Sequence, residues 1–186
     1  MKIILASASP RRYGILTNHG YNVSVVPSNF DEKINGLTYT DKLVENCAYQ
    51  KALDVKNCIG DNEIIVSADT VVVNNGVILG KPKDKDEAVS MLSDLSNKTH
   101  FVATSICLML KGRVICATDK TFVAFRELNS DDILNYIENF KPFDKAGSYG
   151  IQDEGFDFVV SVNGELDNVI GFPMRLFREK LNELII

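Results

Sequence analysis

A short segment near the start of the sequence, Ser7 to Arg12, combines two hydroxyl side chains, a proline and two adjacent arginines. The apolar run 3–6 before it predicts a short buried strand. Ser9 then suits the N-cap of a helix, and Pro10 suits its first position, where the missing N–H costs nothing. The free N–H groups of a helix start attract anions, hydroxyls donate to phosphate oxygens, and arginines add planar charged donors. The segment therefore predicts a polyphosphate site; the alternative is an ordinary strand-to-helix turn with two solvated arginines.

Lys51 stands on what the sequence predicts to be the inward face of a helix. The helix covers roughly residues 41–55, with Thr40 as its N-cap, and its apolar stripe passes through Ala48 and Val55. Lys51 follows Ala48 by three residues and precedes Val55 by four, so its side chain falls on the stripe. A lysine on such a face needs a partner or a ligand. The alternative is that its ammonium group reaches solvent along the edge of the core.

Three further candidates come together at the open end of a predicted hairpin. Two apolar runs, 71–73 and 77–79, flank an Asn-Asn-Gly turn, which is a strong hairpin signal. A three-residue loop pairs Asp69 with Lys81, and a two-residue loop pairs Thr70 with Lys81. Either register brings the three side chains within the spacing of cross-strand neighbours. The alternative is a structural ion pair at the base of the hairpin.

The candidate residues form a mixed set of charges. The cations are Arg11, Arg12, Lys51, Lys81 and Lys145, and the carboxylates are Glu32, Asp69 and Asp144. Cations alone would bind an anion, whereas carboxylates among them indicate a hydrated magnesium or manganese ion that bridges to a phosphate. A carboxylate beside such a metal can orient or deprotonate an attacking water. The set therefore predicts hydrolysis of a nucleoside triphosphate.

The composition narrows the remaining function classes. A net charge of −5 supplies no basic excess for a nucleic-acid backbone, so a nucleic-acid partner is not expected. The four cysteines lack CxxC spacing, and His19 and His100 are the only histidines, which disfavours a zinc site and a nucleophile–histidine mechanism. The sequence shows neither a secretory leader nor an apolar window long enough to span a membrane, so we expect a cytoplasmic chain with reduced thiols.

Apolar runs alternate with amphipathic segments along the chain, without repeats or linkers, which predicts one α/β domain over 1–186. Further predicted strands are 23–26, 64–66, 101–110, 113–117, 121–125 and a buried strand 156–162. Further predicted helices are 10–18, 86–95, one that Ser130 caps and that ends before Pro142, and 174–184. The segment 144–152 is polar and rich in glycine, so we expect it to lie outside the core.

Several motifs, in order and over nearly the whole chain, resemble those of the Maf nucleoside triphosphate pyrophosphatases. They are Ser7 to Arg12, Phe30-Asp31-Glu32, Ala48 to Ala52, Ala68 to Val71, Gly80-Lys81-Pro82, Leu95-Ser96 with Thr99-His100, Asp144 to Gln152 and Gly171-Phe172-Pro173. The resemblance implies a mixed twisted sheet with flanking helices, two lobes around a cleft, and a relation to the inosine-triphosphate pyrophosphatase fold. It also implies a homodimer that uses Mg²⁺ or Mn²⁺ to cleave between the α and β phosphates.

The resemblance also implies roles for individual residues. Asp69 resembles the proton acceptor of the family. Arg11, Thr70 and Gln152 resemble its specificity positions, and their identities are similar to the branch that acts on dTTP and UTP. The conserved pocket residues of the family have similar counterparts in this sequence at Ser7, Arg12, Glu32, Lys51 and Lys81. Together with the helix cap Ser9, these form the expected substrate site, in which Glu32 and Asp69 hold the metal. The chain departs from the family pattern at Asn97, Lys141 and Phe172.

Two other functions fit the same residues. A nucleotide-binding regulator of cell division and septum formation would need the same basic pocket without essential catalysis. A pyrophosphatase for modified purine nucleotides would share the chemistry and differ in the base. The presence of both Asp69 and Glu32 favours catalysis, because a protein that only binds nucleotide has little use for carboxylates beside a polyphosphate.

Overall fold

The computed structural model describes residues 2–186. Its strands are β1 (Lys2–Leu5), β2 (Asn22–Val25), β3 (Ile64–Asn74), β4 (Val77–Leu79), β5 (Thr99–Leu110), β6 (Arg113–Phe125) and β7 (Val159–Asn163). Its helices are α1 (Pro10–Asn18), α2 (Asp41–Ile59), α3 (Lys85–Leu95), α4 (Ser130–Phe140), a short 3-10 helix η1 (Ala146–Ser148), α5 (Leu166–Ile170) and α6 (Met174–Ile185). The predicted alternation of strands and helices is confirmed.

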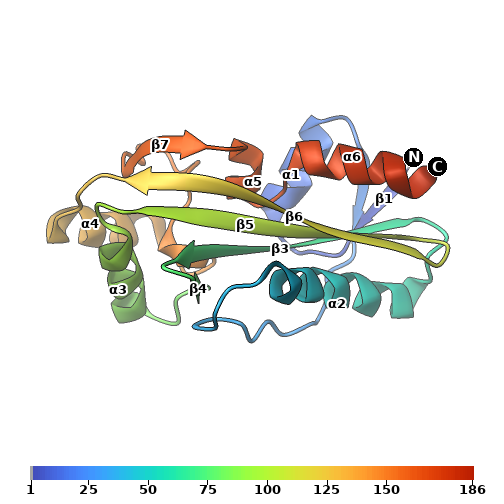
Figure 1. Ribbon diagram of the computed structural model, residues 1–186, viewed down its shortest axis with the longest axis horizontal. Coiled ribbons are helices and arrows are strands. Elements are labelled where there is room, and N and C mark those ends of the chain that lie inside the picture. Colours follow the sequence, from blue (N-terminus) through green and yellow to red (C-terminus); the bar gives the residue numbers. More distant parts are fainter. Residues whose placement is uncertain (1) are drawn as a thin grey trace.

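All strands form one mixed sheet in the order β2-β1-β3-β5-β6-β7, with β4 paired to β3. The β2-β1-β3 part is parallel, and the pairs from β3 onward are antiparallel. The sheet is twisted and runs the length of the molecule, with α2 on one face and α1, α5 and α6 on the other (Figure 1). The predicted mixed twisted sheet with flanking helices is therefore confirmed.

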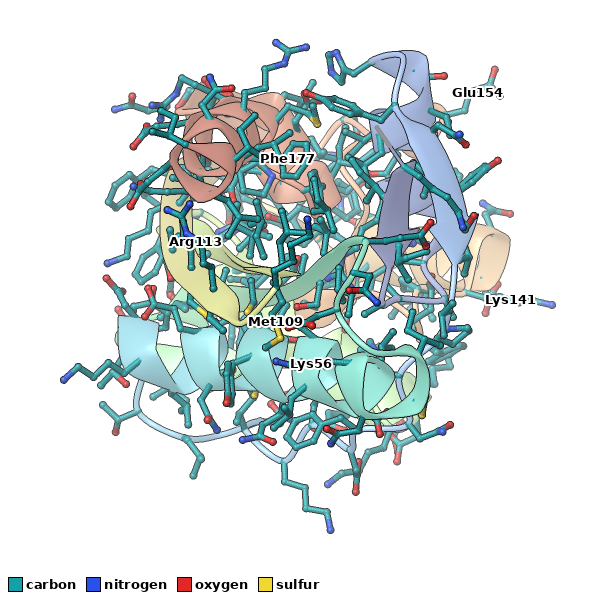
Figure 2. The ribbon with its side chains drawn as sticks, turned by 90° about the vertical axis from the view of Figure 1, so that its right-hand side faces the viewer. Lys56, Met109, Arg113, Lys141, Glu154 and Phe177 are labelled. Carbon is teal, nitrogen blue, oxygen red and sulfur yellow. The ribbon has the colours of Figure 1, made fainter. Side chains whose placement is uncertain are left out.

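Each face of the sheet buries its own apolar core. Leu16, Phe172 and Phe177 pack with β1 and β3 residues under α6, and the small residues Ala48 and Ala52 let α2 approach the opposite face. Seen end-on, Phe177 lies on the α6 side of the sheet and α2 crosses below it (Figure 2). An aromatic core at the far end includes residues of α4 and of the segment before β7. These cores fix β3, whose middle carries Asp69 and Thr70, and the end of β1, which leads into Ser7 and α1.

The β3–β4 hairpin takes the two-residue loop of the two predicted alternatives. Asn74 pairs with Val77, and the turn residues Asn75 and Gly76 have φ of 49° and 79°. Two consecutive positive φ values define the turn that matches the strand twist, and Asn-Gly adopts it at little cost. The ladder ends at Leu79.

The prediction of two separate strands at 113–117 and 121–125 is wrong, because β6 is continuous from Arg113 to Phe125. The polar residues between the two runs stay in the ladder because each has a partner. Thr118 donates to Glu45 at 3.0 Å, and Lys120 forms an ion pair with Asp41 at 2.7 Å.

Three other local predictions need correction. Asn129, not Ser130, caps α4, and it shares a capping box with Asp132. The strand predicted at 156–162 begins only at Val159 and lies on the sheet edge, where most of its residues are exposed. The segment 144–152 does enter the core, because Tyr149 is only 5% exposed and stacks on Phe156.

Candidate functional site

The turn from β1 into α1 has the predicted geometry. Ser9 has extended backbone angles, and its hydroxyl accepts a hydrogen bond from the Arg12 N–H, so it is the N-cap of a helix that begins at Pro10. The Ser7 hydroxyl accepts from the Ser9 N–H at 3.2 Å. Pro10 has no N–H, and the N–H groups of Arg12 and Tyr13 both donate to Ser9, so the start of α1 presents two hydroxyl groups beside the N–H of Arg11.

Arg12 joins three separate parts of the chain. Its Nη1 donates to the Ser7 hydroxyl at 3.1 Å, its Nη2 to Thr70 Oγ1 at 3.0 Å, and its Nε to the Gly171 carbonyl at 3.0 Å. The alternative of a solvated arginine is therefore wrong for Arg12. All three guanidinium nitrogens already donate within the protein, which makes Arg12 a clamp on the walls of the site.

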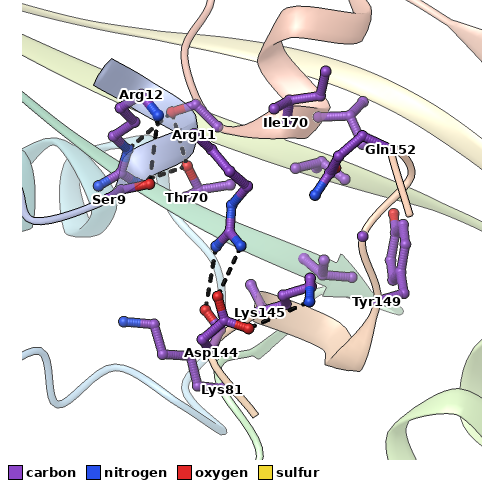
Figure 3. A pocket seen from close by; sticks show the side chains of 16 residues that line it. Ser9, Arg11, Arg12, Thr70, Lys81, Asp144, Lys145, Tyr149, Gln152 and Ile170 are labelled. Carbon is purple, nitrogen blue, oxygen red and sulfur yellow. Dashed lines mark hydrogen bonds and ion pairs between the residues drawn. The ribbon is translucent and has the colours of Figure 1, made fainter. Parts of the chain in front are cut away.

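Arg11 points away from Arg12 and crosses to the segment before η1 (Figure 3). Its Nη1 lies 2.8 Å from Asp144 Oδ2, and its Nη2 donates to the Asp144 carbonyl at 3.4 Å. Asp144 also accepts from Lys145 at 3.4 Å. The Asp144 side chain is 62% exposed and that of Arg11 is 27% exposed, so the pair stays in contact with solvent and is weak enough for a phosphate to displace.

Lys51 lies on α2 and is 6% exposed, so the alternative of an ammonium group reaching solvent is wrong. Its Nζ contacts Asp69 Oδ1 at 2.6 Å, forms an ion pair with Glu32 and donates to the Ala68 carbonyl at 3.3 Å. Asp69 comes from β3, and Glu32 from the loop after β2. One buried ammonium group thus holds the two carboxylates predicted to bind metal.

Burial and charge act differently on the two carboxylates. Burial raises the pKa of Asp69, and the negative charge of Glu32 adds to that rise against the attraction of Lys51. Burial would also raise the pKa of Glu32, but the combined attraction of Lys51, Lys81 and Arg12 is larger and holds this pKa below its ordinary value. Asp69 is therefore the carboxyl group more easily protonated, and Glu32 stays ionised.

Asp69 has an unused acceptor. Within residues 2–186, the buried Oδ2 atom has no hydrogen-bond partner, while Oδ1 is taken by Lys51. A buried carboxylate oxygen without a partner is costly unless a cation or a donor meets it. The donor set of Glu32 and Asp69, both hard oxygen ligands, fits Mg²⁺ or Mn²⁺.

Lys81 does not meet Asp69 as the hairpin register suggested. The β4 ladder stops at Leu79, and the chain turns away at Gly80, whose N–H donates to the Asn35 side chain at 2.9 Å. Among residues 2–186, the ion-pair partner of Asp69 is Lys51, which contradicts the alternative of a structural pair between Asp69 and Lys81. Lys81 instead stands at the mouth of the site.

Two adjoining hollows meet at these residues. Both hollows are lined by Ser9, Arg11, Arg12, Lys81 and Asp144. The larger, about 910 Å³ and open to solvent, adds Ser7, Ser28, Glu32 and Lys51. The smaller, about 540 Å³, adds Thr70, Lys145, Gln152 and a mostly apolar wall of Val72, Val102, Tyr149, Val169 and Ile170. One end of the cleft is charged and the other suits a flat apolar ring.

Not every predicted residue faces the cleft. Asp69 is 1% exposed and lines neither hollow, although Lys51, which contacts it, lines the larger one.

Gln152 is exposed in the wall of the smaller hollow, near Tyr149 and Ile170 (Figure 3). Its amide has no hydrogen-bond partner within residues 2–186 and is free to meet a ligand.

The apolar wall was missed by sequence reasoning. Val102 and Val169 sit in ordinary apolar runs, and Ile170 ends the short helix α5, which the sequence did not predict. The only available signal was the polar, glycine-rich segment 144–152, because such segments carry function more often than regular core elements.

A family model described as Maf-like protein matches residues 2–184. The chain belongs to the Maf family. A Clostridium perfringens protein named dTTP/UTP pyrophosphatase is 45% identical to this Maf chain over 177 residues, which cover 94% of it and 92% of the relative. A Clostridium botulinum protein of the same name is 40% identical and matches the full length of both chains.

A solved structure from Mycobacterium abscessus, titled nucleoside-triphosphatase / dITP/XTP pyrophosphatase, matches 70% of the Maf chain and 77% of its own length. The two are 15% identical, with a TM-score of 0.45. Within residues 2–186, no helix of the Maf chain is long and apolar enough to cross a membrane.

Proposed function

We propose that this Maf chain hydrolyses nucleoside triphosphates, with dTTP and UTP as its best substrates, to the monophosphate and pyrophosphate. The observation that carries the proposal is the pair of adjoining hollows, one charged and one walled by apolar side chains. A triphosphate needs the first and a base needs the second. Two relatives that share at least 40% of their residues with this chain bear the name dTTP/UTP pyrophosphatase.

The phosphates are held at the start of α1. The N–H of Arg11 and the hydroxyls of Ser7 and Ser9 are donors for phosphate oxygens. Arg11 and Lys81 stand at the boundary of the two hollows and supply positive charge. Arg11 leaves Asp144 for the phosphates, since a charge-assisted contact with a polyphosphate exceeds an exposed ion pair.

Glu32 and Asp69 are the residues that would hold a divalent metal. A magnesium or manganese ion there would offset the negative charge of the phosphates. Lys51 keeps the two carboxylates together, because its ammonium group contacts both. The unpartnered Oδ2 of Asp69 supports this assignment.

Asp69 is the proposed proton acceptor for the attacking water, at Oδ2. Burial raises its pKa, and a carboxylate with a raised pKa is a stronger base. Since Asp69 is 1% exposed, the water must enter beside Lys51. The water oxygen bonds to the α-phosphorus while its proton passes to Asp69, the bond from the α-phosphorus to the oxygen that bridges to the β-phosphorus breaks, and pyrophosphate leaves.

The smaller hollow selects the base. The free amide of Gln152 offers one acceptor and two donors, enough to read the O4 and N3–H edge of uracil or thymine. The four free cysteines fit a reducing compartment, which supports a cytoplasmic location.

Product analysis over a panel of nucleoside triphosphates tests the proposal. We expect pyrophosphate and monophosphate from dTTP and UTP with Mg²⁺ or Mn²⁺, and a loss of turnover when a chelator is added. Release of inorganic phosphate with the diphosphate would contradict the proposed bond cleavage. Preferred turnover of a purine triphosphate would support the modified-purine function, and tight binding without turnover would support the regulator.

A further inference from the structure

A chain of hydrogen bonds leads from Arg12 through two threonines to the backbone of α5. Arg12 Nη2 lies 3.0 Å from Thr70 Oγ1, Thr70 Oγ1 lies 3.0 Å from Thr104 Oγ1, and Thr104 Oγ1 lies 2.9 Å from the Asn168 carbonyl. Thr104 is fully buried in β5 and lines neither hollow. Thr70 lines the smaller hollow beside Arg12 (Figure 3).

The two ends of this series of hydrogen bonds determine which atom donates in each of them, because the Arg12 guanidinium only donates and the Asn168 carbonyl only accepts. A carbonyl oxygen only accepts, so Thr104 spends its single hydroxyl hydrogen on Asn168. Thr104 must then accept from Thr70, which spends its own hydrogen on Thr104. The Gly171 carbonyl lies 3.5 Å from Thr70 Oγ1, at the limit of hydrogen-bond distance, and it already accepts from Arg12 Nε at 3.0 Å. Thr104, at 3.0 Å, is therefore the acceptor that holds the Thr70 hydrogen inside the protein.

The end of the chain at Asn168 is fixed in place. Asn168 is fully buried, and its side-chain amide donates to the Val102 carbonyl and to Thr121 Oγ1, both at 3.0 Å. The carbonyl that receives the Thr104 hydrogen therefore cannot rotate away. Since Arg12 occupies one lone pair of the Thr70 oxygen, Thr70 offers the hollow one remaining lone pair and no hydrogen.

We propose that Thr104 is a positioning residue that makes Thr70 a pure hydrogen-bond acceptor, so that the bound nucleotide must present a donor to Thr70. This inference rests on the proposed function. The donors that dTTP and UTP share are the imide N3–H of the base and the 3′-hydroxyl of the sugar, since the 2′-hydroxyl of UTP is absent from dTTP. A nucleotide that lacks the donor leaves a lone pair facing the acceptor of Thr70, which costs affinity.

Two matched analogues of UTP separate the two donors. In 3-deaza-UTP a C–H replaces the imide N3–H, and in 3′-deoxy-UTP the sugar hydroxyl is absent. We expect the wild-type protein to lose about tenfold in kcat/KM with the analogue whose missing donor meets Thr70. Because Gln152 is also proposed to contact the N3–H edge, the donor that meets Thr70 is identified by the analogue whose penalty falls when Thr104 is replaced by valine.

Thr104→Val and Thr104→Ser then test the positioning role. Valine keeps the volume but cannot accept from Thr70, so the Thr70 hydroxyl turns and the penalty on the sensitive analogue falls to about threefold or less. Serine keeps the hydroxyl and should keep the wild-type ratio. A merely destabilised protein would lose activity with UTP and its analogue alike, so the ratio of the two reports the position of the hydrogen.

Equal turnover of UTP and both analogues by the wild type overturns the inference, and this arm needs no variant to fold. A penalty that is the same in wild type and Thr104→Val also overturns it. If UTP binds but is not hydrolysed, the proposed function is wrong. The inference about Thr70 is then tested by calorimetry, in which the affinities for UTP and its two analogues are compared in place of kcat/KM. A wild-type protein that does not bind UTP overturns both.

Discussion

The neighbours Arg11 and Arg12 show how geometry separates two residues of one type. Successive side chains of a helix point about 100° apart, so one arginine of the pair turns into the protein while the other crosses the cleft. Arg12 donates to the walls of the site, and Arg11 pairs with Asp144. The sequence predicted that both lie near phosphate, but the direction of Arg12 depends on contacts with Thr70 and Gly171, and that of Arg11 on its contact with Asp144, which no local pattern contains.

Replacement of Lys51 by Met separates its structural and functional roles. The ammonium group contacts two carboxylates, so Lys51→Met removes the ion-pair partner that Glu32 and Asp69 share and leaves the two negative charges facing each other. We expect a loss of about 3 kcal/mol in the free energy of unfolding. Because a divalent cation can replace the lost charge, Mg²⁺ should raise the melting temperature of this variant more than that of the wild type.

Thermal melts with and without Mg²⁺ check this, with Lys42→Met, an exposed lysine of the same helix, as the control. If Mg²⁺ raises the melting temperatures of wild type and Lys51→Met equally, the metal does not bind at Glu32 and Asp69. The inward position of Lys51 was predictable from helix periodicity. Its contact with Glu32 was not, because the loop that carries Glu32 has no periodic pattern.

Replacement of Gln152 by Glu tests whether the Gln152 amide hydrogen-bonds to the base of the nucleotide. The change removes both amide donors and adds a negative charge toward the O4 acceptor of uracil or thymine. Since Gln152 is exposed, the effect is moderate, about 1 kcal/mol or fivefold in kcat/KM for dTTP and UTP. The loss in kcat/KM for a purine triphosphate, measured in parallel, should be smaller. The other glutamine, Gln50→Glu, is the charge control, and an equal loss for all bases would remove Gln152 from base selection.

At the scale of elements, apolar periodicity predicted the long helices well and the polar parts of strands poorly. The predicted helix starts at Pro10 and Met174 are confirmed. The interior of β6 was missed because its polar residues find partners on α2 and β5, which lie far away in sequence. The hairpin register was left open because both loops fit Asn-Asn-Gly, and the choice depends on which loop matches the strand twist.

His100, in β5, makes the free energy of unfolding depend on pH in a way that can be measured. Its ring is 3% exposed, its Nε2 hydrogen-bonds the Tyr149 hydroxyl at 2.8 Å, and burial lowers its pKa to about 4. The unfolded chain therefore binds a proton at this residue below about pH 6.5, before the folded chain does. Stability from His100 is complete above that pH and falls by about 1.4 kcal/mol per pH unit between pH 6.5 and 4.

Urea unfolding at pH 7, 5.5 and 4.5 measures this effect in wild type and His100→Gln. Glutamine keeps a partner for Tyr149 but does not titrate, so the advantage of the wild type should shrink as the pH falls. The exposed residue His19→Gln is the control. A difference between wild type and His100→Gln that stays constant with pH would show that His100 is not buried in its neutral form.

At the scale of the molecule, the site exists because the two halves of the chain meet. Residues before 82 supply most of the charged end of the cleft, and residues 144–171 close the other side through Asp144 and Gly171. The mixed sheet and its flanking helices were predictable from the sequence and its resemblance to the Maf family. The position of Asp69 beneath Lys51, and the apolar wall of the smaller hollow, required the folded chain.

The central claim is that Asp69 serves catalysis in this cleft. The direct measurement is pyrophosphate release from dTTP with Mg²⁺ by wild type, Asp69→Asn and the exposed control Asp86→Asn, each with a matched thermal melt. We predict that Asp69→Asn loses a factor of about a hundred or more in turnover, while it still melts as a folded protein and Asp86→Asn keeps full activity. A folded Asp69→Asn that retains more than about a tenth of the wild-type rate would contradict the account.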